Sequence, residues 1–99
     1  MKIEKSMNGA DLQIALEGRL DTTTAPELEQ ALKASLDDAN TLTMDFEKLD
    51  YISSAGLRVL LATFKQMSQA KGSMELVNVG VNFRNVLKNT GLDAVFGIF

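Results

Sequence analysis

The positions of apolar residues along the chain predict strands separated by helices. Residues 12–16 and 41–46 place an apolar side chain at every second position, which is the period of a half-buried β-strand. The dipeptide Asn8-Gly9, which is favoured in tight hairpin turns, precedes the first of these stretches. We therefore expect the chain to open with a β-hairpin. Residues 74–79 form the last of the internal strands that the pattern predicts.

Between these strands, apolar residues recur every three or four positions, as on one face of an amphipathic helix. One helix follows Thr24, which has the capping-box spacing to Glu27. A second helix is predicted over about residues 55–71, with Gly72 as its C-terminal cap.

The remaining segments complete the predicted fold. A short third helix around residues 83–87 is expected to end at Gly91, and the apolar residues 94–99 then form a last short strand or a packed tail. The order is β-β-α-β-α-β-α plus this tail. Strands joined through helices pair in parallel, whereas the opening hairpin is antiparallel. The prediction is an α/β fold in one domain, residues 1–99, with a mixed sheet and helices mainly on one face.

The composition narrows the chemistry that this domain can perform. The chain has no cysteine and no histidine, which removes disulfides, thiol catalysis and the usual general base. A formal charge of −3 with scattered lysines argues against tight binding of nucleic acid. No apolar run approaches the roughly twenty residues of a membrane span, and the N-terminus does not resemble a signal peptide. We therefore expect a cytoplasmic protein.

Residues 50–57 are the most informative part of the sequence, because a short polar turn opens there directly onto a helical pattern. Ser53 and Ser54 stand where the predicted helix begins, and the small residues Ala55 and Gly56 follow. A helix N-terminus has free N–H groups and a positive dipole end. A serine hydroxyl there caps the helix or, once phosphorylated, places its phosphate where these groups favour it. From position alone both interpretations stay open, and a plain N-cap is the commoner use.

Several motifs, together with the order of elements, resemble the STAS domain family of bacterial anti-sigma factor antagonists. The matching stretches are Gly18-Arg19-Leu20-Asp21, Met44-Asp45-Phe46, residues 49–57 and Asn89-Thr90-Gly91-Leu92. The resemblance covers nearly the whole chain. It implies that a partner kinase phosphorylates a serine at the start of the helix after the central strand, and the register set by Gly56 puts this acceptor on Ser54. Ser53 stands where the family usually has an aspartate, and it is the alternative acceptor.

The resemblance implies partner switching in the regulation of transcription. The unphosphorylated protein would bind an anti-sigma factor that is also a serine kinase, and a serine phosphatase would restore this form. The predicted phosphorylation and contact residues are Asp21, Ser53, Ser54, Ala55, Gly56 and Arg58. Structural uses remain as alternatives: a capping or solvated carboxylate at Asp21, close helix–sheet packing at Gly56 and a solvated side chain at Arg58.

Two other functions are weighed against this one. STAS domains also serve as regulatory subunits of lipid or anion transporters and as parts of stress-sensing assemblies. A small enzyme with Ser54 as its nucleophile is disfavoured, because only lysine or a carboxylate is present to act as its base. We therefore expect no enzyme and no catalytic residue. We also expect no cofactor or metal of its own, since the acidic residues lack the spacing of a calcium loop and the kinase would supply ATP and magnesium. These acidic residues are Asp21, Asp45, Glu47 and Asp50.

Overall fold

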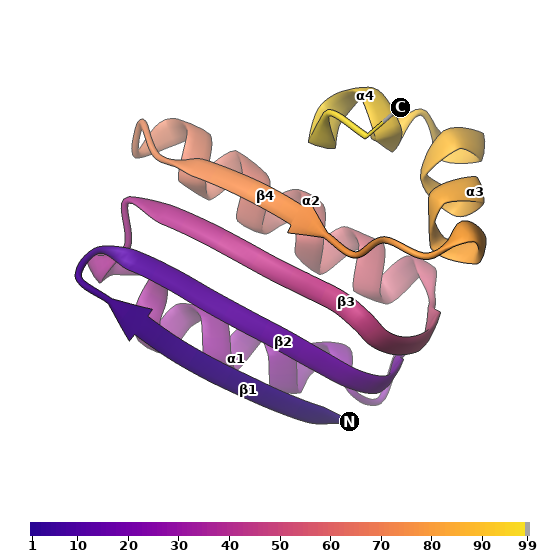
Figure 1. The fold of residues 1–99 in the computed structure, drawn as a ribbon, viewed down its shortest axis with the longest axis horizontal. Helices are drawn as coiled ribbons and strands as arrows, with labels where there is room; N and C mark the ends of the chain where they lie inside the picture. Colours follow the sequence, from indigo (N-terminus) through magenta and orange to yellow (C-terminus); the bar gives the residue numbers. More distant parts are fainter. Residues whose placement is uncertain (99) are drawn as a thin grey trace.

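The computed structural model describes residues 1–98 and shows a four-stranded sheet with helices packed against it (Figure 1). In chain order the elements are β1 (Lys2–Asn8), β2 (Asp11–Leu20), α1 (Ala25–Ser35), a 3₁₀ helix (Leu36–Asp38), β3 (Thr41–Ile52), α2 (Ser54–Gln69), β4 (Ser73–Val77), α3 (Val81–Thr90) and α4 (Leu92–Phe96). The predicted α/β architecture is confirmed. Within the described residues, no helix has the length and apolar character needed to cross a membrane.

The sheet is mixed, as predicted, and its strands follow the order β1-β2-β3-β4. β1 pairs antiparallel with β2 through the turn at Asn8-Gly9, where Gly9 has a φ of +63°. β2, β3 and β4 run parallel to one another. Parallel neighbours need crossover connections, which α1 and α2 supply. Figure 1 shows both helices on the same face of the sheet, so the other face is left open.

The core lies between this helical layer and the sheet. Both predicted periods are observed, because alternate residues of β2 and β3 are buried and every third or fourth residue of the helices faces them. The buried side chains of the four elements include Leu12, Ile14, Leu16, Leu28, Leu32, Leu42, Met44, Leu60 and Met67. Helix α2 begins and ends within two residues of its predicted limits, and β3 runs on past its predicted end to Ile52.

Helices α3 and α4 lie beside β4, toward the end of the sheet where the parallel strands finish (Figure 1). Phe83 of α3 packs edge-on against Phe46 of β3, with ring centroids 4.9 Å apart. Phe96 of α4 packs in the same way against Phe64 of α2, at 5.6 Å. The two helices meet at Gly91, whose φ of +77° ends α3 as predicted. These aromatic contacts extend the core past the edge of the sheet.

Helix α4 corrects the strand, one of the two alternatives predicted for residues 94–99, whereas the packed-tail alternative agrees with the burial of Phe96. Leu92 is half-buried and Phe96 is buried, one helical turn apart. A strand would place Ala94 on the same face as these two residues, yet Ala94 is exposed. Phe99, the last residue of the predicted tail, lies outside the described residues.

Two helix caps also differ from the prediction. The hydroxyl of Thr24 does not cap α1, because it donates to the carbonyl of Arg19 at 2.8 Å and accepts the N–H of Asp21 at 2.8 Å. After α2 the left-handed residue is Lys71 (φ +62°), and not Gly72. Gly72 is needed for close packing instead, since an added Cβ would lie 2.7 Å from a backbone oxygen of the loop before β3.

Candidate functional site

β2 and β3 end at the same edge of the sheet, and this brings two predicted site segments together. Leu20 at the end of β2 is in register with Ile52 at the end of β3. The N–H of Ser53 then donates to the carbonyl of Leu20 at 2.9 Å. Asp21 and the serine turn therefore leave adjacent parallel strands at one point on the surface.

The serine turn uses its two serines differently. Ser53 is the N-cap of α2, with extended backbone angles, and its hydroxyl accepts the N–H of Gly56 at 3.4 Å. The carbonyl of Ser53 accepts the N–H of Leu57 at 3.0 Å. Ser54 is the first residue of the helix and is exposed. Among residues 1–98 the Ser54 hydroxyl makes no hydrogen bond, so capping the helix does not occupy it.

Gly56 allows the start of α2 to sit directly on the ends of the two strands. It is buried, and an added Cβ would lie 2.7 Å from Cγ of Leu20 and 3.0 Å from Cγ1 of Ile52. Contacts this short require the neighbours to move, so the position tolerates no side chain without repacking. The close-packing interpretation of Gly56 is therefore confirmed. This packing sets the position of the serine turn relative to the sheet.

The carboxylate of Asp21 organises the turn between β2 and α1. Its Oδ1 accepts the backbone N–H groups of Thr23 at 3.0 Å and of Thr24 at 3.1 Å. The pKa of Asp21 is held below its ordinary value, chiefly by the N–H of Thr24 and further by the Thr24 hydroxyl, the Thr23 N–H and the charge of Arg19. The guanidinium of Arg19 lies 3.9 Å from the other carboxylate oxygen. The structural interpretation of Asp21 as a turn-capping residue is thus observed, and its half-buried position still leaves it on the surface.

A stacked pair beside the serine turn was missed by the sequence analysis. The guanidinium of Arg19 lies over the ring of Tyr51, 4.2 Å from its centroid. The two residues are cross-strand partners in β2 and β3, and Tyr51 is 44% exposed. Val81, at the start of α3, is 75% exposed and lines a shallow groove with Tyr51. The sequence did contain a signal for the exposure of Tyr51. It directly precedes the apolar residue Ile52, and successive side chains of a strand point to opposite faces.

Ala55 and Arg58, in the first turns of α2, lie next to α1. Arg58 is exposed and Ala55 is half-buried. Both line a shallow groove between α1 and α2 that also includes Thr22 and Pro26. Of the predicted contact residues, Ser54 and Arg58 are therefore exposed, Asp21, Ser53 and Ala55 are partly exposed, and Gly56 is buried.

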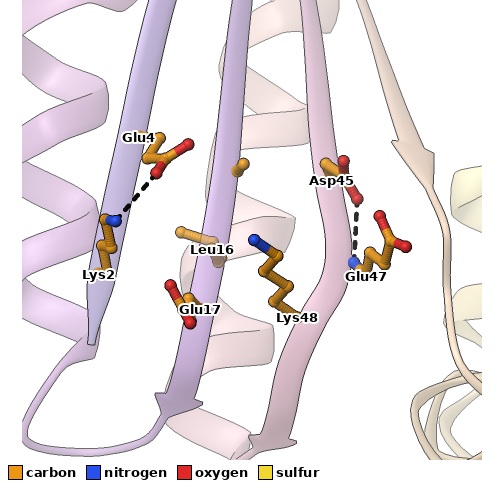
Figure 2. A pocket seen from close by; sticks show the side chains of 8 residues that line it. Lys2, Glu4, Leu16, Glu17, Asp45, Glu47 and Lys48 are labelled. Carbon is orange, nitrogen blue, oxygen red and sulfur yellow. Dashed lines mark hydrogen bonds and ion pairs between the residues drawn. The ribbon is translucent and has the colours of Figure 1, made fainter.

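The open face of the sheet carries a separate shallow pocket, shown in Figure 2. Lys2 pairs with Glu4 at 3.2 Å, and this contact raises the pKa of Lys2. Asp45 accepts the side-chain amide of Asn78 at 3.0 Å and the N–H of Glu47 at 2.9 Å, and these bonds, the Asn78 bond above all, lower its pKa. Other lining residues are Ala15, Leu16, Glu17 and Lys48. Within residues 1–98, no three histidine, cysteine or carboxylate side chains gather as a metal site would require.

The fold and the serine turn together define a small α/β domain whose distinctive site is an exposed turn at the end of parallel strands. A model of the STAS domain family matches residues 2–99, and the chain belongs to this family.

Individual relatives agree with this assignment. BtrV of Bordetella bronchiseptica is 33% identical over 99 residues, which cover 99% of this chain and 85% of that protein. The anti-sigma-B factor antagonist of Bacillus subtilis is 26% identical over 98 residues, covering 99% of this chain and 90% of the relative. Among solved structures, an anti-sigma factor antagonist from Mycobacterium paratuberculosis superposes with a TM-score of 0.84 at 27% identity, over 99% of this chain and 84% of the other. Phosphorylated SpoIIAA of Bacillus has the same fold, with a TM-score of 0.79 at 21% identity, over 94% and 86% of the two chains.

Proposed function

We propose that this chain is an anti-sigma factor antagonist that is switched by phosphorylation of Ser54. The unphosphorylated form binds an anti-sigma factor and so releases the sigma factor. The anti-sigma factor is also a serine kinase, which transfers the γ-phosphoryl group of ATP to the Ser54 hydroxyl oxygen, with loss of the hydroxyl proton and release of ADP. A serine phosphatase hydrolyses the phosphate and restores the binding form. This exchange takes place in the cytoplasm, and the chain itself performs no catalysis.

The observation that carries this proposal is the division of roles between the two serines. Ser53 caps α2, whereas Ser54 is exposed and its hydroxyl makes no hydrogen bond within the described residues 1–98. Modification of Ser54 therefore removes no hydrogen bond from the folded domain. A phosphate at the first position of α2 also lies near free N–H groups and the positive end of the helix dipole. The fold supports a modification that changes the surface and leaves the core intact.

The size of the charge explains how one phosphate can act as a switch. It adds about −1.5 to −2 charges at neutral pH. Two like unit charges 4 Å apart repel by about 1 kcal/mol in water and by about 4 kcal/mol at an effective dielectric constant of 20. Asp21, at the same edge of the sheet, is negative at neutral pH like other aspartates, and its lowered pKa favours this charged form further. A partner that approaches this edge with its own carboxylates would therefore lose orders of magnitude in affinity.

The contact surface in this proposal surrounds Ser54. Asp21 and Arg58 present charged groups from two sides of the turn, and Ala55 keeps the helix start narrow enough for a kinase active site to approach. Ser53 presents part of its surface, while Gly56 acts indirectly by holding the turn against the strands. The names of the relatives support a partner of the anti-sigma class.

Incubation with candidate kinase-type anti-sigma factors, ATP and magnesium tests the proposal, with mass mapping of the phosphate. We expect a single phosphate on Ser54, its absence in Ser54→Ala and its retention in the matched variant Ser53→Ala. A phosphate found only on Ser53 would contradict the assignment of the acceptor. Binding to no anti-sigma factor, together with capture by the cytoplasmic domain of a transporter, would favour the transporter-subunit alternative.

A further inference from the structure

Arg58 lies one helical turn beyond Ser54 on the same face of α2. The helix begins at Ser54, and residues four apart in a helix are surface neighbours. Side chains in a helix lean toward its N-terminus, so a long side chain at position 58 covers the first turn. Arg58 does line the groove together with Ala55 and Thr22, which border that turn. The guanidinium is thus attached where it can reach a group on the Ser54 oxygen.

The Arg58 guanidinium forms no ion pair within the described residues. Among residues 1–98 no carboxylate lies within 4.0 Å of it, and the ion pairs found there involve Lys2, Arg19 and Lys33 as cations. Glu29 lines the same groove but pairs with Lys33 at 3.5 Å. The carboxylate of Asp21 accepts two backbone N–H groups and lies near Arg19. Within the part of the chain that the structure describes, an exposed arginine without an anionic partner therefore lies one helical turn from an exposed serine without a hydrogen bond.

We propose that Arg58 binds the phosphate of phosphorylated Ser54 within the same helix. The inference rests on the proposed function for the phosphate itself. The planar guanidinium presents paired N–H donors that match two phosphate oxygens, and such charge-assisted bonds are among the strongest hydrogen bonds on protein surfaces. The free N–H groups of the first turn help to hold the phosphate in the same place.

This pairing gives phosphorylation two effects at once. In the unmodified protein Arg58 is an exposed cation next to the serine turn, available to an acidic group of a partner. In the phosphorylated protein the phosphate on Ser54, in the same helix, neutralises this cation. The modification therefore adds negative charge and also withdraws a positive contact.

The test uses protein in which phosphoserine is incorporated at position 54 during translation, so that no kinase is needed. The second pKa of the phosphate, ordinarily about 6, is measured by ³¹P NMR titration in the wild-type background, in Arg58→Gln and in the matched control Arg84→Gln. Arg84 is an exposed arginine on α3. Loss of the Arg58 charge should raise this pKa by about 0.2–0.7 units, a roughly 1.6- to 5-fold change in proton affinity, whereas the control should leave it unchanged. The difference should shrink at about 1 M salt, where the Debye length is about 3 Å.

Equal phosphate pKa values in the wild-type background and Arg58→Gln would overturn the inference, as would an equal rise in Arg84→Gln. The Arg58 Nε–H resonance gives a second readout, and it should move on phosphorylation only if the guanidinium meets the phosphate. Failure here is distinct from failure of the proposed function. A phosphate that blocks partner binding without a pKa change contradicts only the role of Arg58, whereas a pKa change in a protein that no kinase modifies contradicts only the switch.

Discussion

Replacement of Gly56 by alanine tests whether the serine turn is held in place by close packing. The new Cβ would lie 2.7 Å from Cγ and 2.9 Å from Cδ2 of Leu20, and 3.0 Å from Cγ1 of Ile52. Leu20 is 0% exposed and Ile52 is 8% exposed, so neither side chain can swing into solvent. Overpacking of this kind costs about 1–3 kcal/mol, and the better helix propensity of alanine offsets about 0.5–1 kcal/mol. We expect Gly56→Ala to lower the free energy of unfolding by about 0.5–2 kcal/mol.

Urea denaturation followed by circular dichroism measures this loss, and each kcal/mol should also lower Tm by about 4–8 °C in a domain of this size. Gly80→Ala is the matched control, because a Cβ there has no atom of the described residues within 4 Å apart from its chain neighbours, and its φ of −72° suits any residue. We expect the control to stay within about 0.5 kcal/mol, since the poorer N-cap and the stiffer unfolded chain oppose each other. If Gly56→Ala were as stable as Gly80→Ala, the contacts of Gly56 would not be what positions the turn.

Three further predictions concern the serines and the open face of the sheet. Ser53→Ala should lose about 0.5–2 kcal/mol because it removes the cap, whereas Ser54→Ala should stay within about 0.5 kcal/mol; the reverse order in urea denaturation would contradict the assignment of the cap. Ser54→Asp should bind the anti-sigma partner more weakly while its Tm stays within a few degrees of wild type, since a helix N-terminus tolerates a carboxylate; affinity loss caused by unfolding would refute this. The folded-state pKa of Asp45 is lowered from 3.8, so its contribution to stability is complete above that pH and is lost as pH falls through the folded value. Asp45→Asn should flatten the acid limb of the curve of stability against pH, and an unchanged limb would argue against the Asn78 hydrogen bond.

The elements of the fold follow closely from local patterns. Period-two burial in β2 and β3 and the three-to-four period in α1 and α2 were both readable, because each element buries a single face. The start of α2 was also readable, since serine and small residues precede its first apolar position. The helical form of the packed segment after Gly91 was not predicted, because a five-residue helix is too short to display a period.

The position of the candidate site could be predicted from the sequence, but the role of each residue within it could not. The sequence placed Ser53 and Ser54 at a helix start but did not distinguish the cap from the exposed hydroxyl, because adjacent residues both suit the position. For a related reason the sequence predicted Thr24 as the capping residue before α1 and left capping by Asp21 as an open alternative. Either side chain can satisfy the free N–H groups before α1, and the hydrogen bond of the Thr24 hydroxyl to the carbonyl of Arg19 decides between them.

The sequence by itself determined the order of the strands and of the first three helices, the parallel connections and the turn at which the proposed phosphate would act, since these depend on residues close together in the chain. Only the tertiary structure decided which groups that turn meets. The register of Leu20 with Ile52 brings Asp21 beside the serine turn, sets Arg19 over Tyr51 and leaves no room for a side chain at Gly56. These are contacts between residues some thirty positions apart, as the paired numbers show. Their geometry depends on how the whole sheet and helix pack, which no local period of the sequence records.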